Sequence, residues 1–98
     1  MDALGVVAEP RRREILRLIW DEERSAGVIA GHFDVSFAAV SQHLRVLRTA
    51  GFVTSRRDGR QRFYRANKKG VGDLRPVLTA MWRANLDRLA DLAEEAER

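Results

Sequence analysis

Cysteine is absent from this chain of 98 residues, and histidine is scarce. Without cysteine the chain has no disulfide, no thiolate nucleophile and no metal site built on sulfur. The two histidines, His32 and His43, have no clear carboxylate partner at ligand spacing, and no glycine-rich loop that would hold a phosphate is present. We therefore expect no catalytic residue, no metal and no cofactor, so the chain is not expected to be an enzyme.

Long hydrophobic runs are also missing, because no stretch reaches the roughly 18 apolar residues of a membrane span. The first residues, MDALGVVAEPRRR, lack the apolar core and cleavage site of a secretory leader. Together with the missing cysteine, this predicts a protein of the reducing cytoplasm with no membrane partner. A chain of this length has room for one core, which predicts a single domain over residues 1–98.

Positive charge is abundant, and it is concentrated in the middle of the chain. The net charge is +4, but residues 41–69 hold nine basic residues and one acidic residue, whereas the remainder holds nine basic and thirteen acidic residues. Such a separation is typical of a surface that binds a polyanion. The alternative is a solvated basic surface without a partner.

The first part of the chain predicts two helices that meet near Pro10. Leu4 and Val7 indicate a short first helix, and proline is well tolerated in the first turn of the next one. In RRREILRLIWDEE, apolar residues from Ile15 to Trp20 recur at helical spacing. The second segment is therefore interpreted as a scaffold helix.

Two further helices follow, each opened by a serine. Ser25 can cap a short helix and Ser36 a longer one, because a serine oxygen accepts a hydrogen bond from a first-turn amide. Gly51 is expected to end the longer helix in a left-handed conformation. The core face of that helix is expected to contain Phe37, Val40, Leu44 and Leu47.

A β-hairpin and a final helix complete the pattern. Residues 52–57 and 60–66 are rich in β-formers, and Asp58-Gly59 between them favours a tight type I′ turn. Asp73 can cap a last helix that has Pro76 in its first turn. Two short helices joined by a turn and followed by a basic hairpin predict a winged helix-turn-helix fold, mainly α with a β-hairpin wing (α+β). The expected order is four helices, two strands and one helix.

The last helix carries more apolar surface than a small monomer can cover. Leu74, Leu78 and Met81 follow a seam at spacings of four and three, Leu89 continues it about two turns later, and Trp82 widens it. A second copy of the chain is the expected cover. Met81 and Trp82 could alternatively line a small ligand pocket, although a bulky aromatic at helical spacing more often belongs to the core.

The surface of the longer helix carries groups suited to base edges in duplex DNA. With Val40 and Leu44 turned to the core, Ala38 and Gln42 lie on the opposite side and Ser41 on the flank. Gln42 can make a bidentate contact with adenine, Ser41 can bond to a base or a phosphate, and the small Ala38 allows close approach. Gln42 is the first choice for reading sequence.

The arginines are expected to hold the phosphate backbone. Arg45 and Arg48 extend the helix surface, and most protein-DNA hydrogen bonds go to phosphate or sugar. Arg57, Arg60 and Arg62 of the hairpin can reach phosphate or a narrow minor groove, unless the hairpin tip is merely solvated. His43, on the flank of the helix, either contacts DNA or packs within the fold. Both alternatives stay open. The neighbouring Phe63 and Tyr64 are expected to lie on opposite faces of a strand, rather than to stack on single-stranded bases.

The segments VSQHLRVLRTAGFV and RRDGRQRFY resemble the recognition helix and wing of the ArsR-type family of bacterial winged-helix repressors, and AEPRRREILRLI resembles the scaffold helix. The resemblance implies a homodimer built from the first and last helices, a two-fold symmetric operator and repression until a signal weakens binding. It also implies DNA contacts from Ser41, Gln42 and His43 and from Arg57 and Arg60. The expected DNA contacts are Ser36, Ala38, Ser41, Gln42, His43, Arg45, Arg48, Arg57, Arg60 and Arg62. The expected dimer contacts are Leu4, Val7, Leu74, Leu78, Met81, Trp82 and Leu89.

The chain differs from the metal-sensing members of the family that it resembles, because it lacks their metal ligands. Those members carry cysteine pairs before the recognition helix, or histidine and carboxylate clusters in the last helix. The corresponding segments here read AGVIAGHF and LRPVLTAMWRANLDRLADLAEE, which supply no ligand set for a transition metal. The effector therefore stays unknown. The alternative function is a winged-helix adaptor that holds a protein partner without specific DNA binding.

Overall fold

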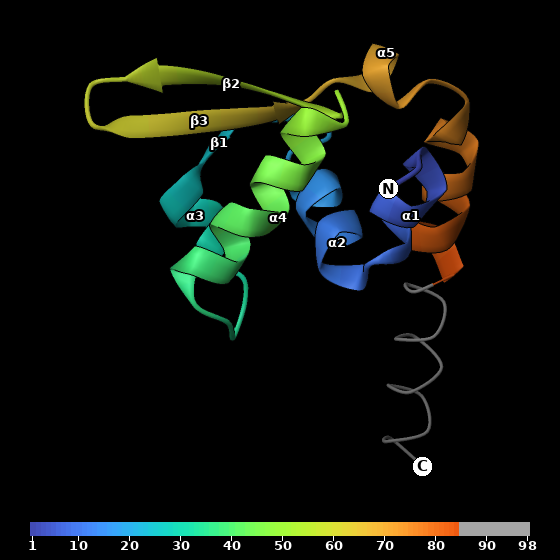
Figure 1. The fold of residues 1–98 in the computed structure, drawn as a ribbon, viewed down its shortest axis with the longest axis horizontal. Helices are drawn as coiled ribbons and strands as arrows, with labels where there is room; N and C mark the ends of the chain where they lie inside the picture. Colours follow the sequence, from blue (N-terminus) through green and yellow to red (C-terminus); the bar gives the residue numbers. More distant parts are fainter. Residues whose placement is uncertain (85–98) are drawn as a thin grey trace.

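The computed structural model describes residues 1–84, and within them the predicted order of helices and strands is confirmed with three additions. The additions are a two-residue strand before the helix-turn-helix and, after the hairpin, a short α-helix and a 3₁₀ turn. Figure 1 shows the hairpin extending from one end of the molecule, above α3 and α4. The elements are α1 (Ala3–Ala8), α2 (Pro10–Leu18), β1 (Arg24–Ser25), α3 (Ala26–Ala30), α4 (Phe37–Thr49), β2 (Val53–Asp58), β3 (Gln61–Ala66), α5 (Lys68–Val71), the 3₁₀ turn η1 (Gly72–Leu74) and helical residues 75–84.

The predicted signals at the ends of the helix-turn-helix are confirmed. The Ser25 hydroxyl accepts a hydrogen bond from the Val28 amide at 3.2 Å, and the Ser36 hydroxyl accepts one from the Ala39 amide at 3.1 Å. Gly51, with φ +82°, turns the chain out of α4. These contacts satisfy first-turn amides and allow the sharp turn into β2.

The ends of α2 and of the C-terminal helix are confirmed in part. Pro10 is the first residue of α2, and the Glu9 carboxylate accepts a hydrogen bond from a first-turn amide. Pro76 lies in the first turn of helical residues 75–84, as predicted. The predicted Asp73 cap is wrong, because the chain makes an extra 3₁₀ turn and Asp73 lies inside it.

The hairpin is part of a three-stranded antiparallel sheet with the order β1-β3-β2. The last paired residues are Asp58 and Gln61, so Gly59 and Arg60 are the two central residues of the turn. Gly59 has φ +63°. Only glycines have a positive φ in the described part of the chain, so the φ of Arg60 is negative. The turn therefore has the single positive φ of type II′, not the predicted type I′ with Asp58-Gly59 at its centre.

The core lies between α2, α4 and the base of the hairpin. Val40, Leu44 and Leu47 of α4 are buried, as predicted. Phe37 is the exception, since 57% of it is exposed, and its assignment to the core face is wrong. A helical wheel gives a direction around the axis but no position along it, and Phe37 is the first residue of α4, before the packed turns. The largest fully buried side chains are Ile15, Leu16, Ile19, Ile29, Leu44, Leu47 and Leu78.

The first helix belongs to this core. Val6 and Val7 are buried, and the guanidinium of Arg12 donates to the Val6 carbonyl at 2.7 Å. Arg13 donates to the Val7 carbonyl at 3.0 Å. Because these arginines satisfy carbonyls at the end of α1, the helix is anchored to α2 of the same chain.

The C-terminal helix packs beside α1, at the end of the molecule away from the wing (Figure 1). Leu78 is fully buried, and the ring of Trp82 meets that of Trp20 edge-on at 5.1 Å between centroids. The Trp82 indole also donates to the Arg13 carbonyl at 3.2 Å. Trp82 is therefore packed within the chain, which favours the core interpretation of this residue over a ligand pocket.

Candidate nucleic-acid interface

The outer surface of α4 is polar and accessible. It stands over Val40, Leu44 and Leu47, which anchor the opposite face in the core. Because the anchoring face is rigidly packed, the outer side chains are held at defined positions. The predicted contact residues that lie exposed at this surface or at its cap are Ser36, Ala38, Ser41, Gln42, Arg45 and Arg48.

His43 faces α2 rather than solvent. Its side chain is mostly buried, and its Nδ1 lies 3.9 Å from Oε2 of Glu9, the residue that caps α2. Of the two alternatives that the sequence left open for His43, the structure favours packing within the fold.

The wing, residues 53–66, has two different faces because side chains alternate along a strand. Val53 pairs with Ala66 and both are buried, so this face of the hairpin is turned to the helices. Arg57 pairs with Arg62 in the same alternation and therefore shares that face. The guanidinium of Arg62 donates to the Ser55 hydroxyl at 3.2 Å, which orients it along the hairpin.

Side chains on the opposite face of the wing contact other segments of the same chain. The Arg56 guanidinium forms an ion pair with Glu23 at 2.7 Å and lies over the Phe63 ring at 4.8 Å from its centroid. The hydrogen bond from Arg56 lowers the pKa of the Glu23 carboxyl. Lys68 likewise pairs with Asp21 at 2.7 Å. Two of the nine basic residues in the middle of the chain therefore already have acidic partners, which sequence counting missed.

A groove of about 230 Å³ runs between α4 and the wing. Three guanidinium groups reach it from two elements, Arg45 and Arg48 from α4 and Arg62 from β3. Guanidinium groups with nearby hydroxyls match the geometry of a phosphate, which accepts several charge-assisted hydrogen bonds at once. We call this the arginine groove, and its lining residues are Ser41, Leu44, Arg45, Arg48, Arg62 and Tyr64.

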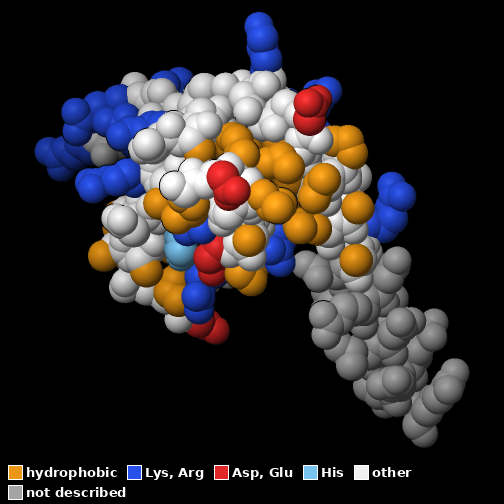
Figure 2. Space-filling model, turned by 45° about the vertical axis from the view of Figure 1, so that its right-hand side comes forward, with side chains coloured by type: hydrophobic (Ala, Val, Ile, Leu, Met, Phe, Trp, Pro, Cys, Tyr) orange, Lys and Arg blue, Asp and Glu red, His pale blue; other side chains and the backbone are white. Residues whose placement is uncertain are grey.

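Arg57 and Arg60 extend the positive surface to the tip of the wing, where both are exposed. Figure 2 shows Lys and Arg side chains gathered over this end of the molecule. Of the wing residues, Tyr64 contacts the core cluster from the inner face, while Phe63 lies under Arg56 on the outer face. The two rings thus occupy opposite faces of β3, as the alternation predicted.

Comparison with known proteins identifies the family. The family model for bacterial regulatory proteins of the arsR family matches residues 9–55, which span α2 to the first part of the wing. The HTH-type transcriptional regulator Rv2034 of Mycobacterium tuberculosis is 35% identical over 92 residues, covering 94% of this chain and 86% of the relative. The chain belongs to the ArsR family. It is a winged-helix DNA-binding transcriptional regulator and not an enzyme.

Other relatives of this ArsR-family regulator agree with that placement. The transcriptional repressor SdpR of Bacillus subtilis is 36% identical over 67 residues, covering 68% of this chain and 74% of the relative. A solved structure described as a possible transcriptional regulator for arsenical resistance has 45% identity and a TM-score of 0.73, covering 93% of this chain and 95% of its own. The sequence relatives and the structural neighbour therefore indicate the same class of protein, a transcriptional regulator, and the structural neighbour also shares the fold.

The end of this ArsR-family regulator opposite the wing exposes apolar residues. Leu4 of α1 is 55% exposed and Val77 of the C-terminal helix is 38% exposed, whereas Leu74 and Met81 are partly buried. Figure 2 shows hydrophobic side chains gathered over this end. We call the exposed surface of α1 and helical residues 75–84 the end face.

Two of the expected dimer contacts lie inside the protomer. Val7 and Leu78 are fully buried, because these side chains close the core between α1, α2 and the C-terminal helix, and they are withdrawn from the expected interface. Trp82 packs on Trp20 but stays partly exposed, like Leu74 and Met81. Leu89 lies outside the described residues.

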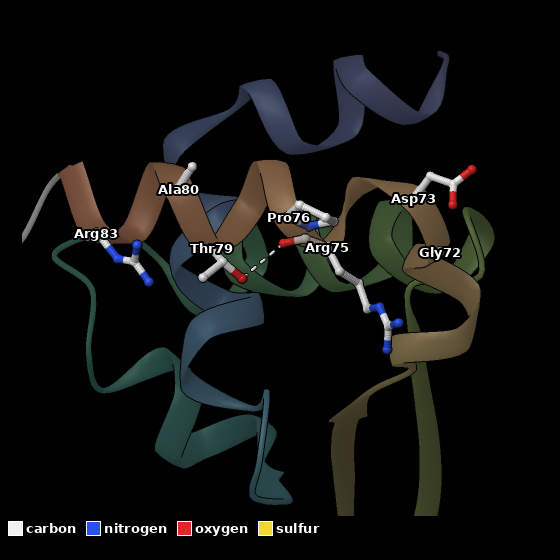
Figure 3. Close-up of a pocket in the computed structure, with 7 residues that line it drawn as sticks. All are labelled: Gly72, Asp73, Arg75, Pro76, Thr79, Ala80 and Arg83. Carbon is white, nitrogen blue, oxygen red and sulfur yellow. Dashed lines mark hydrogen bonds between the residues drawn. The ribbon is translucent and has the colours of Figure 1, made fainter.

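Helical residues 75–84 also border a shallow depression of about 550 Å³ (Figure 3). Its lining combines four small uncharged residues with three charged ones, Asp73, Arg75 and Arg83, and the Thr79 hydroxyl donates to the Arg75 carbonyl at 2.9 Å. Small side chains let a second helix approach closely. The lining residues are Gly72, Asp73, Arg75, Pro76, Thr79, Ala80 and Arg83.

Residues 1–84 contain neither a candidate metal-binding cluster nor a candidate membrane-spanning helix. No three histidine or acidic side chains there come together as a set that could hold a metal ion. In the same part of the chain, no helix is long and apolar enough to cross a membrane.

Proposed function

We propose that this regulator is a homodimeric repressor that binds a two-fold symmetric operator in duplex DNA. The observation that carries the proposal is the arginine groove beside an exposed Gln42, because it combines phosphate contacts with a group that can read a base edge. Phosphate contacts set the register on the duplex, and base contacts select the sequence.

In the proposed complex, α4 lies in the major groove. Gln42 makes a bidentate contact with an adenine, while Arg45, Arg48 and Arg62 hold a phosphate of the backbone that separates the major groove from the minor groove. The tip of the wing carries Arg57, and with it a second phosphate contact or a contact in the minor groove. The predicted contacts of Ser36, Ala38, Ser41 and Arg60 remain part of this proposal, whereas His43 acts by packing against α2.

The end face forms the proposed dimer interface. Leu4 and Val77 supply exposed apolar area, and the small residues around Ala80 allow the two C-terminal helices to meet closely. An interface of this kind relates the two copies by a two-fold axis, which a symmetric operator would match. The two recognition helices would then read half-sites about 10 base pairs apart, or a multiple of that spacing.

Repression follows from occupying the promoter, and the repressor SdpR among the relatives supports this direction of control. The exposed positive surface also argues against the protein adaptor considered from the sequence, since a polyanion is its natural partner. No effector is assigned.

The proposal is tested by selecting sequences from a random duplex library with the full chain. We expect an inverted repeat, a complex that contains two chains, and binding that survives an excess of unrelated competitor DNA. Weak binding that the competitor abolishes would refute the proposal and favour the adaptor. A reporter promoter that carries the selected sequence should be silenced by the protein. An increase in its output would refute the repressor assignment alone.

A further inference from the structure

Phe37 is a large apolar side chain that the fold leaves in water, and the function described so far does not use it. It is the first residue of α4 and 57% of it is exposed. Single exposed hydrophobic residues are common, so the exposure of Phe37 alone does not indicate a function. The residues that surround Phe37 do indicate one.

Phe37 shares one side of α4 with residues of the arginine groove. At 100° per residue, Ser41 lies about 40° and Arg48 about 20° from Phe37 around the helix axis. Both of those residues line the arginine groove. Phe37 therefore extends this row by one turn toward the start of α4.

A second, smaller depression joins Phe37 to the wing. It has a volume of about 180 Å³ and is lined by Phe37, by Arg60, Gln61 and Arg62 of the wing and by residues 25–27. Arg62 lines this depression and the arginine groove alike. The Phe37 ring thus stands at one end of the space that is proposed to receive the phosphate backbone, next to the first turn of the helix that enters the major groove.

We propose that Phe37 is a specificity-determining residue that contacts the C5-methyl group of a thymine. This inference rests on the proposed function. Thymine carries the single apolar group that bases present in the major groove, and this methyl lies at the edge of the groove, near the backbone of its own strand. An apolar ring beside arginines that hold this backbone is placed to cover the methyl group. Contact removes apolar surface of both partners from water.

This role is separate from that of Gln42, which lies about 140° from Phe37 around the helix axis and offers polar groups to adenine. Two side chains on one helix would then read two different base pairs of each half-site. One reading depends on hydrogen bonds and the other on a methyl group.

The test uses the operator duplex selected with the wild-type protein, with thymines replaced one at a time by deoxyuridine, which lacks only the methyl group. We expect one thymine in each half-site at which replacement weakens wild-type binding about four-fold, the effect of exposing one methyl group. The Phe37→Ala variant should bind the intact operator more weakly and lose no further affinity at that thymine. Phe37→Leu should keep part of the methyl effect.

Val28→Ala is the matched control. Val28 is 49% exposed and lies on α3, outside the recognition helix, so this variant should respond to deoxyuridine like the wild type. Melting curves should show all variants folded, because neither side chain is buried.

The outcomes separate the two proposals. If the wild-type chain selects no operator, the proposed function fails and this inference fails with it. If it selects an operator, but the operator has no methyl-sensitive thymine or the sensitivity is the same in Phe37→Ala, the inference alone is overturned.

Discussion

Arg56 and Arg57 are neighbours in β2 with the same side chain, but they lie on opposite faces of the wing. Arg56 is paired with Glu23 and stacked on Phe63, whereas Arg57 shares the inner face with Arg62. Replacing each in turn by alanine removes the same charge from two adjacent positions. Comparing the two variants therefore separates a phosphate contact from the general positive potential of the wing.

The expected magnitude follows from counterion release. Each phosphate contact contributes about 0.9 to the slope of the logarithm of the binding constant against the logarithm of the salt concentration. A dimer has two wings, so Arg57→Ala should flatten the slope by about 1.8. Between about 50 and 200 mM salt, the affinity difference between wild type and this variant should shrink about twelve-fold. Arg56→Ala should leave the slope close to the wild-type value, because its guanidinium is held by Glu23.

The assay is a titration of the selected operator and of a scrambled duplex at several salt concentrations. Arg57→Ala should weaken binding to both duplexes alike, since a phosphate contact carries no sequence information. Melting curves should show both variants folded, because both arginines are exposed. Equal slopes for the two variants would refute the assignment of the inner face to DNA, as would a larger effect of Arg56→Ala.

Three further predictions concern base reading, close packing and assembly. Gln42→Ala should relax the preference at one base pair of each half-site by about ten-fold without changing the salt slope. Gel shifts on operator variants measure this preference, and an equal loss of affinity for every sequence would contradict the prediction. Gly70→Ala should lower the melting temperature by at least about 4 °C, because the new Cβ would overlap the Gly51 carbonyl oxygen, whereas Gly27→Ala has open space and should melt no lower than the wild type. Val77→Asp should yield monomers in light scattering and weaken operator binding, and a stable dimer of this variant would refute the end face as the interface.

Local signals predicted the helix-turn-helix well. The caps at Ser25 and Ser36 and the left-handed Gly51 depend on bonds and dihedral angles within a few residues, so the sequence determines them nearly alone. The burial of Val40 and Leu44 follows from helical periodicity for the same reason. Most of the recognition surface could therefore be predicted from the residues, because it is the reverse side of a periodic pattern.

Contacts between distant segments limited the prediction elsewhere. The two residues of β1 form a strand because they pair with β3, about 40 residues later, and two residues show no period of their own. Arg56 counted as free positive charge until folding brought Glu23, 33 residues earlier, to its side chain. The sequence shows how many charges there are, but only the fold decides which of them neutralise each other.

The amino-acid sequence by itself determined where α3 and α4 begin, where α4 ends, which side of α4 is polar and that the middle of the chain is basic, because each of these depends on neighbours along the chain. The tertiary structure decided that Val7 and Leu78 close the protomer core and that Phe37 stays in water beside the wing. Burial is a property of the space between elements, and that space exists only once α1, α2 and the C-terminal helix have packed together.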